Sequence, residues 1–182
     1  MDEQAWPAWC SAMVHRGVGL IMVDGRLPNI DQLLSSARQV IGRRLVGVVE
    51  PVNPEIHSDV IHLRSADQAG LWPTSLVGCE VSGADEAQGA EEAGCAYVVT
   101  DAHNLEVTAD MAQWVKDHPQ MVWFLAGCEN SSDLEEAIRQ GVRRVWINDD
   151  DGMEIAACSA LLRDAWRADP AMALVRGQRG VR

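Results

Sequence analysis

Acidic side chains recur where the apolar stretches of this sequence end. Six such stretches are each followed within a few residues by a carboxylate, and these are Asp24, Glu50, Glu80, Asp101, Glu129 and Asp149. Only two basic side chains, Arg26 and Arg64, fall in corresponding places. If the fold brings these stretch ends together, the site that they form will be strongly acidic, and anions will be repelled unless a metal ion intervenes.

His103 is a candidate for proton transfer. It follows the apolar stretch 97–100 on a polar loop, and an imidazole that titrates near neutral pH can act as a general base. A solvated loop histidine without a catalytic role is the alternative interpretation. His62 lies inside an apolar stretch, and we interpret it as a packed, hydrogen-bonded core histidine.

The apolar pattern predicts a scaffold that would gather these side chains. Seven stretches are predicted to be strands, at 18–23, 45–49, 59–63, 76–80, 95–100, 121–125 and 142–147. They alternate with helical patterns or short crossovers, which is typical of parallel βαβ units. Because the carboxyl ends of parallel strands share one edge, the acidic residues would meet at one open end of the sheet, the mouth.

Helical periodicity and end signals predict the intervening helices. A Trp-rich helix begins near Pro7, and further helices cover 30–41, 82–94, 108–117, 132–141 and the segment of Ile155 and Trp166. Ser82 and Ser132 are predicted to cap two of these helices. The polar segment 64–75 contains Pro73 and is predicted to be a loop.

The composition indicates one soluble domain over residues 1–182, with 168–182 as a flexible tail. Apolar residues make up 47% and charged residues 23% of the chain. The net charge of −12 argues against nucleic acid or an anionic membrane as a partner. No apolar run is long enough to span a membrane, and a signal peptide is not recognisable. Five scattered cysteines are expected to be reduced, inert core thiols, so a cytoplasmic location is predicted.

The order of segments resembles the thiamine phosphate synthase/TenI superfamily, whose members are TIM barrels. Four passages carry the resemblance: DVIHLRSAD at 59–67, VGCE at 77–80 with AGCAY at 93–97, FLAGC at 124–128, and QGVRRVWI at 140–147. Over roughly residues 8–166, it implies a shortened (β/α) barrel without the family's first strand. An open doubly wound sheet is the alternative fold. Since a missing strand exposes two sheet edges, we expect the Trp-rich helix or a second subunit to cover them.

The resemblance also implies a chemistry. Family members join two thiamine precursors and release pyrophosphate with the help of magnesium. On matching positions, the roles implied are magnesium binding for Glu50 and Asp67, phosphate or substrate binding for Thr100, Gly127 and Arg64, and catalysis for His103 and Arg26. A small phosphorylated thiamine precursor is the expected ligand.

The chain departs from the family where the chemistry takes place. Residues of other character stand at matching positions, namely Met22, Asp24, Ser65, Glu80 and Asp149. Two unit charges about 4 Å apart interact by roughly 4 kcal/mol at an effective dielectric constant of about 20, so a diphosphate at this mouth would be strongly repelled. Two functions stay open: a residual transferase or tautomerase for thiamine-precursor phosphates, and a non-catalytic barrel that acts through a partner or as a homo-oligomer.

Overall fold

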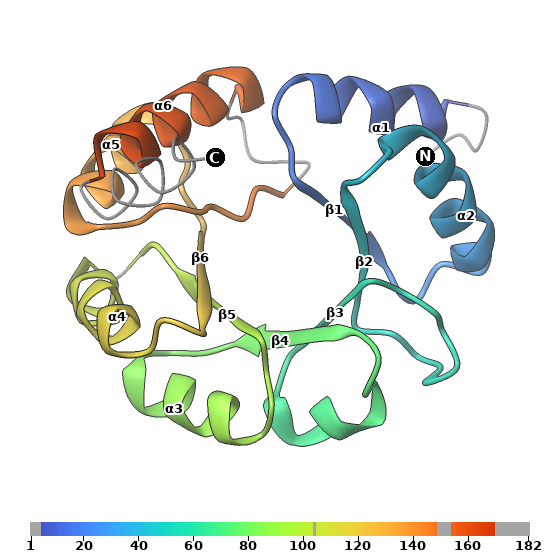
Figure 1. The fold of residues 1–182 in the computed structure, drawn as a ribbon, viewed down its shortest axis with the longest axis horizontal. Helices are drawn as coiled ribbons and strands as arrows, with labels where there is room; N and C mark the ends of the chain where they lie inside the picture. The colour runs from blue at the N-terminus through green and yellow to red at the C-terminus, as the bar shows by residue number, and fades with distance from the viewer. Residues whose placement is uncertain (1–4, 104, 149–153, 170–182) are drawn as a thin grey trace, which may run out of the picture.

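Six parallel strands form one curved sheet with helices on its outside (Figure 1). The computed structural model describes residues 5–103, 105–148 and 154–169. The strands are β1 (Leu20–Asp24), β2 (Leu45–Val49), β3 (Val60–Leu63), β4 (Leu76–Glu80), β5 (Tyr97–Asp101) and β6 (Val122–Ala126). Their order in the sheet follows their order in the chain, and every neighbouring pair is parallel. The result is a half-barrel of the shortened TIM type, which confirms the predicted fold class.

The helices follow the predicted alternation closely. They are α1 (Trp6–His15), α2 (Ile30–Ile41), α3 (Ala84–Glu92), α4 (Leu105–Asp117), α5 (Ser131–Gln140) and α6 (Ile155–Ala168). Their apolar stripes face the sheet: in α2 the buried positions are Ile30, Leu33, Leu34, Ala37 and Ile41, which lie on one face at helical spacing. The predicted loop 64–75 instead contains a 3₁₀ helix, η1 (Ala66–Leu71), whose first turn is capped by Ser65.

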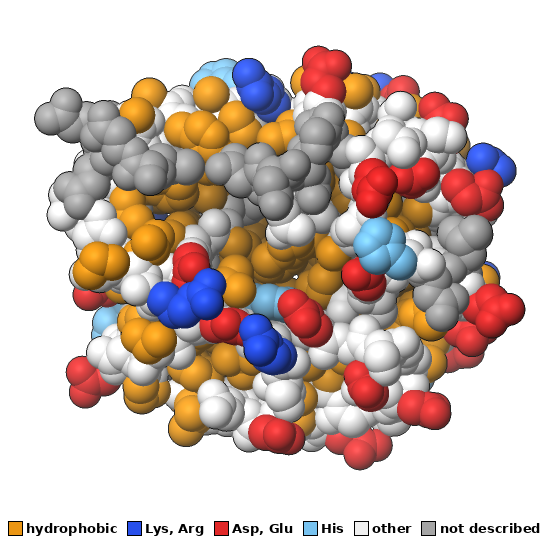
Figure 2. Space-filling view, turned by 180° about the vertical axis from the view of Figure 1, so that it is seen from behind, with side chains coloured by type: hydrophobic (Ala, Val, Ile, Leu, Met, Phe, Trp, Pro, Cys, Tyr) orange, Lys and Arg blue, Asp and Glu red, His pale blue; other side chains and the backbone are white. Residues whose placement is uncertain are grey.

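On β1 and β6, the strands at the two ends of the sheet, the two faces differ in how deeply their side chains are buried. Side chains that point outward, such as Ile21 and Leu125, are buried beneath the helices. Their inward-pointing neighbours, such as Met22 and Phe124, are only partly buried. The interior of the barrel is therefore reached by solvent, and Figure 2 shows a hollow lined by apolar side chains on this face of the molecule.

The predicted seventh strand, 142–147, is wrong as a full strand. Only one bridge forms, between Val145 and Leu125 of β6. The carbonyl of Arg143 accepts a hydrogen bond from the Trp166 indole of α6 at 2.9 Å, and the Arg143 guanidinium donates to the carbonyl of Ile138 at 3.1 Å. These bonds direct the segment toward the helices, so the sheet stays open between β6 and β1.

Helix α1 lies near the open side of the sheet (Figure 1). Trp6 is buried, and its indole donates to the carbonyl of Leu33 in α2 at 2.9 Å, while Trp9 stacks on Trp6 with 5.3 Å between ring centroids. Gly17, just past α1, lies against Ser159 of α6. Trp6 thus belongs to the core, and a second subunit over the edges stays a prediction.

Some predictions fall outside the described residues. The mouth position of Asp149 and the tail from residue 170 onward belong to this group. The described part of the predicted tail, Ala168 and Asp169, instead ends α6, and Asp169 forms an ion pair with Arg143. Among the helices that the structure describes, none is long and apolar enough to cross a bilayer.

Candidate functional site

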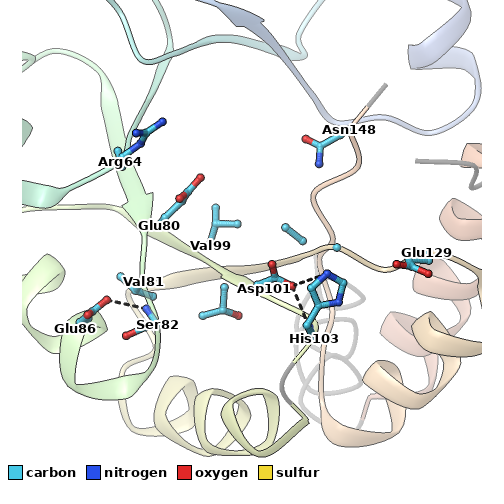
Figure 3. Close-up of a pocket in the computed structure, with 13 residues that line it drawn as sticks. Arg64, Glu80, Val81, Ser82, Glu86, Val99, Asp101, His103, Glu129 and Asn148 are labelled. Atoms are coloured by element: carbon cyan, nitrogen blue, oxygen red, sulfur yellow. Dashed lines mark hydrogen bonds and ion pairs between the residues drawn. The ribbon is translucent and has the colours of Figure 1, made fainter. Parts of the chain in front are cut away.

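A pocket of about 670 Å³ opens at the carboxyl ends of β4, β5 and β6 (Figure 3). Its lining residues are Arg64, Glu80, Val81, Ser82, Glu86, Val99, Thr100, Asp101, His103, Ala126, Gly127, Glu129 and Asn148. Three of the predicted mouth carboxylates, Glu80, Asp101 and Glu129, therefore do meet at one site. Figure 3 shows Arg64 and Glu80 on one side of the opening and Asn148 on the other.

Both predicted mouth arginines are engaged by carboxylates. Arg26 binds Asp24 with its Nη2 at 2.7 Å and its Nε at 2.9 Å. Arg64 Nη2 lies 2.9 Å from Glu50 Oε1. Hydrogen bonds from the Arg26 side chain and backbone hold the pKa of Asp24 below its ordinary value. The arrangement leaves neither arginine as an isolated positive charge that faces the pocket.

Glu50 and Asp67, the predicted magnesium ligands, do not form a metal site with a third side chain. Glu50 has a left-handed backbone, with φ of 47°, and its carboxylate is bound by Arg64. Asp67 lies on η1, where its backbone N–H contacts the Ser65 hydroxyl. Nowhere in the described part of the chain do three His, Cys, Asp or Glu side chains gather as they would around a metal ion. Magnesium needs only one or two carboxylates beside water and substrate oxygens, so magnesium binding by Glu50 and Asp67 stays a prediction, and no step is derived through a metal ion.

Thr100 and Gly127, the predicted phosphate contacts, both border the pocket. Thr100 is only 2% exposed, and its hydroxyl accepts a hydrogen bond from the Trp123 indole at 2.8 Å. The side chains of Thr100 and Trp123 both lie on the outer face of the sheet, so the Thr100 hydroxyl points toward the helices. Gly127 has a φ of 78°, and a Cβ there would lie 2.8 Å from Asp101 Oδ1, so the backbone runs tightly along the pocket at this point.

His103 lies on the exposed loop after β5, as the sequence predicts. Its backbone N–H donates to Asp101 Oδ1 at 2.9 Å, and its Nε2 lies 3.8 Å from the same oxygen (Figure 3). Both side chains are about two-thirds exposed, at 69% and 66%. A carboxylate beside an imidazole can orient the ring for proton transfer, but here water reaches both groups.

His62 lies beside the site, although the sequence predicts only a core role for it. The core role is confirmed, since the side chain is 5% exposed and its Nδ1 lies 3.3 Å from the Tyr97 hydroxyl. Its Nε2, however, faces Glu80 Oε1 at a distance of 3.9 Å. Burial lowers the pKa of His62 to about 4, so the ring is neutral at pH 7. Strand alternation could have shown that His62 shares a face with neighbours inside the barrel, but not that this face meets a pocket.

The five cysteines are free and buried, as predicted. Cys79 of β4 and Cys95, after α3, lie close together, with their sulfur atoms 3.9 Å apart. Both pack in the layer between the sheet and the helices, and the hydrogen bond from the Cys95 thiol, together with burial, raises the pKa of Cys79. None of the five lines the pocket.

Comparisons with known proteins bear on the fold. No family model and no curated protein sequence matches the chain. Among solved structures, a native KDPGal structure is 16% identical with a TM-score of 0.68, over 92% of this chain and 90% of that chain. Thiamine phosphate pyrophosphorylase from Pyrococcus furiosus is 16% identical with a TM-score of 0.66, over 88% and 89%. The 2-keto-3-deoxy-6-phosphogluconate aldolase of Zymomonas mobilis ZM4 with 3-phosphoglycerate is 14% identical with a TM-score of 0.62, over 94% and 89%. At these identities the likeness shows the fold alone, and that fold is the TIM-type barrel that these enzymes share.

Proposed function

We propose that the protein is a divergent barrel of the thiamine phosphate synthase/TenI kind that has lost diphosphate transfer and binds a small ligand at its mouth. The ion pairs of Arg26 with Asp24 and of Arg64 with Glu50 are the observation that carries this proposal. Transfer from a diphosphate needs several cations that face the developing negative charge. Instead, four carboxylates and one arginine line the described pocket, so an anionic transition state would be destabilised there.

The scarcity of lysine supports the loss of a second kind of chemistry. Lys116 is the only lysine of the chain, and it lies in the last turn of α4, where it donates to Gln113 Oε1 at 3.1 Å. A lysine that forms an imine with a carbonyl substrate must lie in the site. Aldolase chemistry through a lysine imine therefore receives no support from these residues.

The test is calorimetric titration of the protein with pyrophosphate in the presence of magnesium. We expect no binding in the micromolar range, and no thiamine phosphate when the protein is incubated with both phosphorylated thiamine precursors and magnesium. A matched variant, Asp24→Asn, releases Arg26 from its ion pair and should raise the affinity for pyrophosphate. Micromolar or tighter binding by the unmodified protein would overturn the proposal.

Proton transfer by His103 is the second candidate, because Asp101 lies beside its ring and holds its backbone. It would tautomerise a thiamine-precursor phosphate without breaking a diphosphate bond. Turnover of the thiazole phosphate tautomer, followed by ultraviolet absorbance and abolished in His103→Gln but not in the exposed control His57→Gln, would establish this activity in place of simple binding. Equal turnover by the unmodified protein and His103→Gln, or no turnover by either of these two proteins, would rule this candidate out.

A further inference from the structure

Four aromatic rings form a continuous layer across the interior of the barrel. His62 of β3 lies 5.9 Å from Tyr97 of β5 and 4.7 Å from Trp146, between ring centroids. Phe124 of β6 closes the circle, at 5.6 Å from Tyr97 and 6.4 Å from Trp146. The only tyrosine and the only phenylalanine of the chain are both used here. Phe124 and Trp146 are partly exposed, so part of the layer is accessible to a ligand.

The pocket wall continues from this layer toward the carboxyl ends of the strands. Val99 and Asp101 follow Tyr97 at alternate positions of β5, and Ala126 follows Phe124 in the same way on β6. Val99, Asp101 and Ala126 line the pocket. Small side chains above large rings leave room for a ligand, and the hollow in Figure 2 has apolar surface inside, with both acidic and basic side chains along its edge.

Two hydrogen-bond acceptors face each other at the boundary between the rings and the pocket. The Tyr97 hydroxyl donates to the carbonyl of Ile61 at 3.1 Å, so it can accept the Nδ1 proton of His62 at 3.3 Å. This network assigns the proton of the neutral ring to Nδ1 and leaves a lone pair on Nε2. Nε2 and Glu80 Oε1 are 3.9 Å apart, too far for a direct hydrogen bond. No donor from the described residues is recorded between these two atoms.

The charge of the pocket favours a positive ligand. Glu80 lines the pocket with a side chain that is 67% exposed, and Asp101, which also lines it, is 66% exposed. Arg64 is the one arginine among the described lining residues, and Glu50 already neutralises it at 2.9 Å. A cleft of one sign concentrates ligands of the opposite sign.

We propose that this pocket binds a small, flat organic cation with N–H donors, of the amidinium or protonated aromatic amine class. Its N–H groups bridge Glu80 and His62 Nε2, and its flat body lies over the rings of Phe124 and Trp146. Aromatic faces attract a cation, and the effect grows where water is excluded. This inference rests on the proposed function, in which the mouth binds a small ligand and no diphosphate, and it names the class of that ligand.

The test compares two ligands of nearly the same shape by calorimetry, benzamidinium and neutral benzamide. We expect benzamidinium to bind at least about tenfold more tightly, and added salt to weaken its binding but not that of benzamide. Glu80→Gln should weaken benzamidinium binding by about tenfold, whereas Glu92→Gln, the same change on exposed α3, should leave it unchanged. Phe124→Leu should weaken it by about fivefold.

Equal binding of the two ligands would overturn this inference, and so would no binding of benzamidinium by protein whose circular dichroism spectrum shows an intact fold. An unchanged affinity in Glu80→Gln would also overturn it. Tight pyrophosphate binding in the presence of magnesium would instead contradict the proposed function. Absence of binding by both benzamidinium and pyrophosphate leaves the proposed function standing and removes the cation inference alone.

Discussion

His62 and His103 have the same side chain in opposite surroundings. His62 packs between Tyr97 and Trp146 inside the barrel, whereas His103 extends into water beside Asp101. The sequence predicts both locations, because one histidine lies within an apolar stretch and the other follows one. The sequence could not show that His62 points into the barrel. Alternation along a strand separates its two faces but does not tell which face the helices cover and which faces the interior.

The buried position of His62 gives the protein a defined pH dependence. Its pKa in the folded state, about 4, lies below the ordinary value of 6.5. Between these values the unfolded chain binds a proton that the folded chain does not, so the free energy of unfolding falls as the pH falls. We expect a loss of about 2–3 kcal/mol between pH 7 and 4.5 from this group alone, measured by urea denaturation.

Two variants isolate this effect from the carboxylates, which titrate at lower pH. His62→Gln removes the titrating ring, so its loss of stability between the two pH values should be smaller than that of the unmodified protein by the same amount. His57→Gln alters an exposed histidine and should keep the full dependence. Parallel curves for the unmodified protein and His62→Gln would contradict the assigned origin.

The first residues of helices α3 and α5 show how well helix caps can be predicted from the sequence. Ser132 is the predicted cap of α5, but the structure assigns the cap to Asn130, whose side-chain oxygen accepts from the backbone N–H groups of Ser132 and Asp133 at 2.9 and 3.1 Å. At α3, Gly83 is the cap residue, and the backbone N–H of Ser82 donates to Glu86 at 2.7 Å. The polar clusters correctly predict where helices begin, whereas several residues in each cluster could serve as the cap.

The two candidates for the α5 cap can be separated by mutation. Asn130→Ala removes the acceptor of two backbone N–H groups, and we expect it to lower the free energy of unfolding by about 1 kcal/mol. Ser132→Ala should change it by less than about half of that, because the Ser132 side chain makes no described capping bond. Chemical denaturation followed by circular dichroism measures both, and a larger cost at Ser132 would restore the cap that the sequence predicts.

The segment 142–147 shows where an element prediction fails. Its apolar pattern matches that of a strand, and Val145 does pair with β6 at one bridge. The competing contacts come from parts of the chain that are remote in sequence, the indole of Trp166 and the carboxylate of Asp169, which bind the backbone carbonyl and side chain of Arg143. A pattern within six residues cannot include such partners, so the end of the sheet is a tertiary effect.

At the scale of the molecule, the order and parallel direction of the first six strands were predictable, because strand and helix patterns alternate throughout. The acidic mouth was also predictable, as Glu80, Asp101 and Glu129 follow strand ends that share one edge. The pairing of Arg64 with Glu50 was not, since these two residues approach only after β2 and β3 pair. Which charges remain free in a site is thus decided by the assembled barrel.

Two large side chains inside the barrel, Met22 and Tyr97, lie opposite glycines of the neighbouring strands, and the last prediction concerns this packing across the sheet. Gly78 of β4 pairs with Tyr97 of β5, and a Cβ at Gly78 would overlap the Tyr97 ring. That ring cannot move away freely, because its hydroxyl is bonded to the carbonyl of Ile61 and it packs on Phe124. Gly78→Ala should therefore lower the free energy of unfolding by about 1–3 kcal/mol.

Gly89→Ala places the same methyl group on α3 with nothing within 4 Å, and it should raise the free energy of unfolding by about 0.5–1 kcal/mol through helix propensity. Guanidinium denaturation should show that the two variants change the free energy of unfolding in opposite directions. A Gly78→Ala variant more stable than the unmodified protein would contradict the close packing of Tyr97 against Gly78.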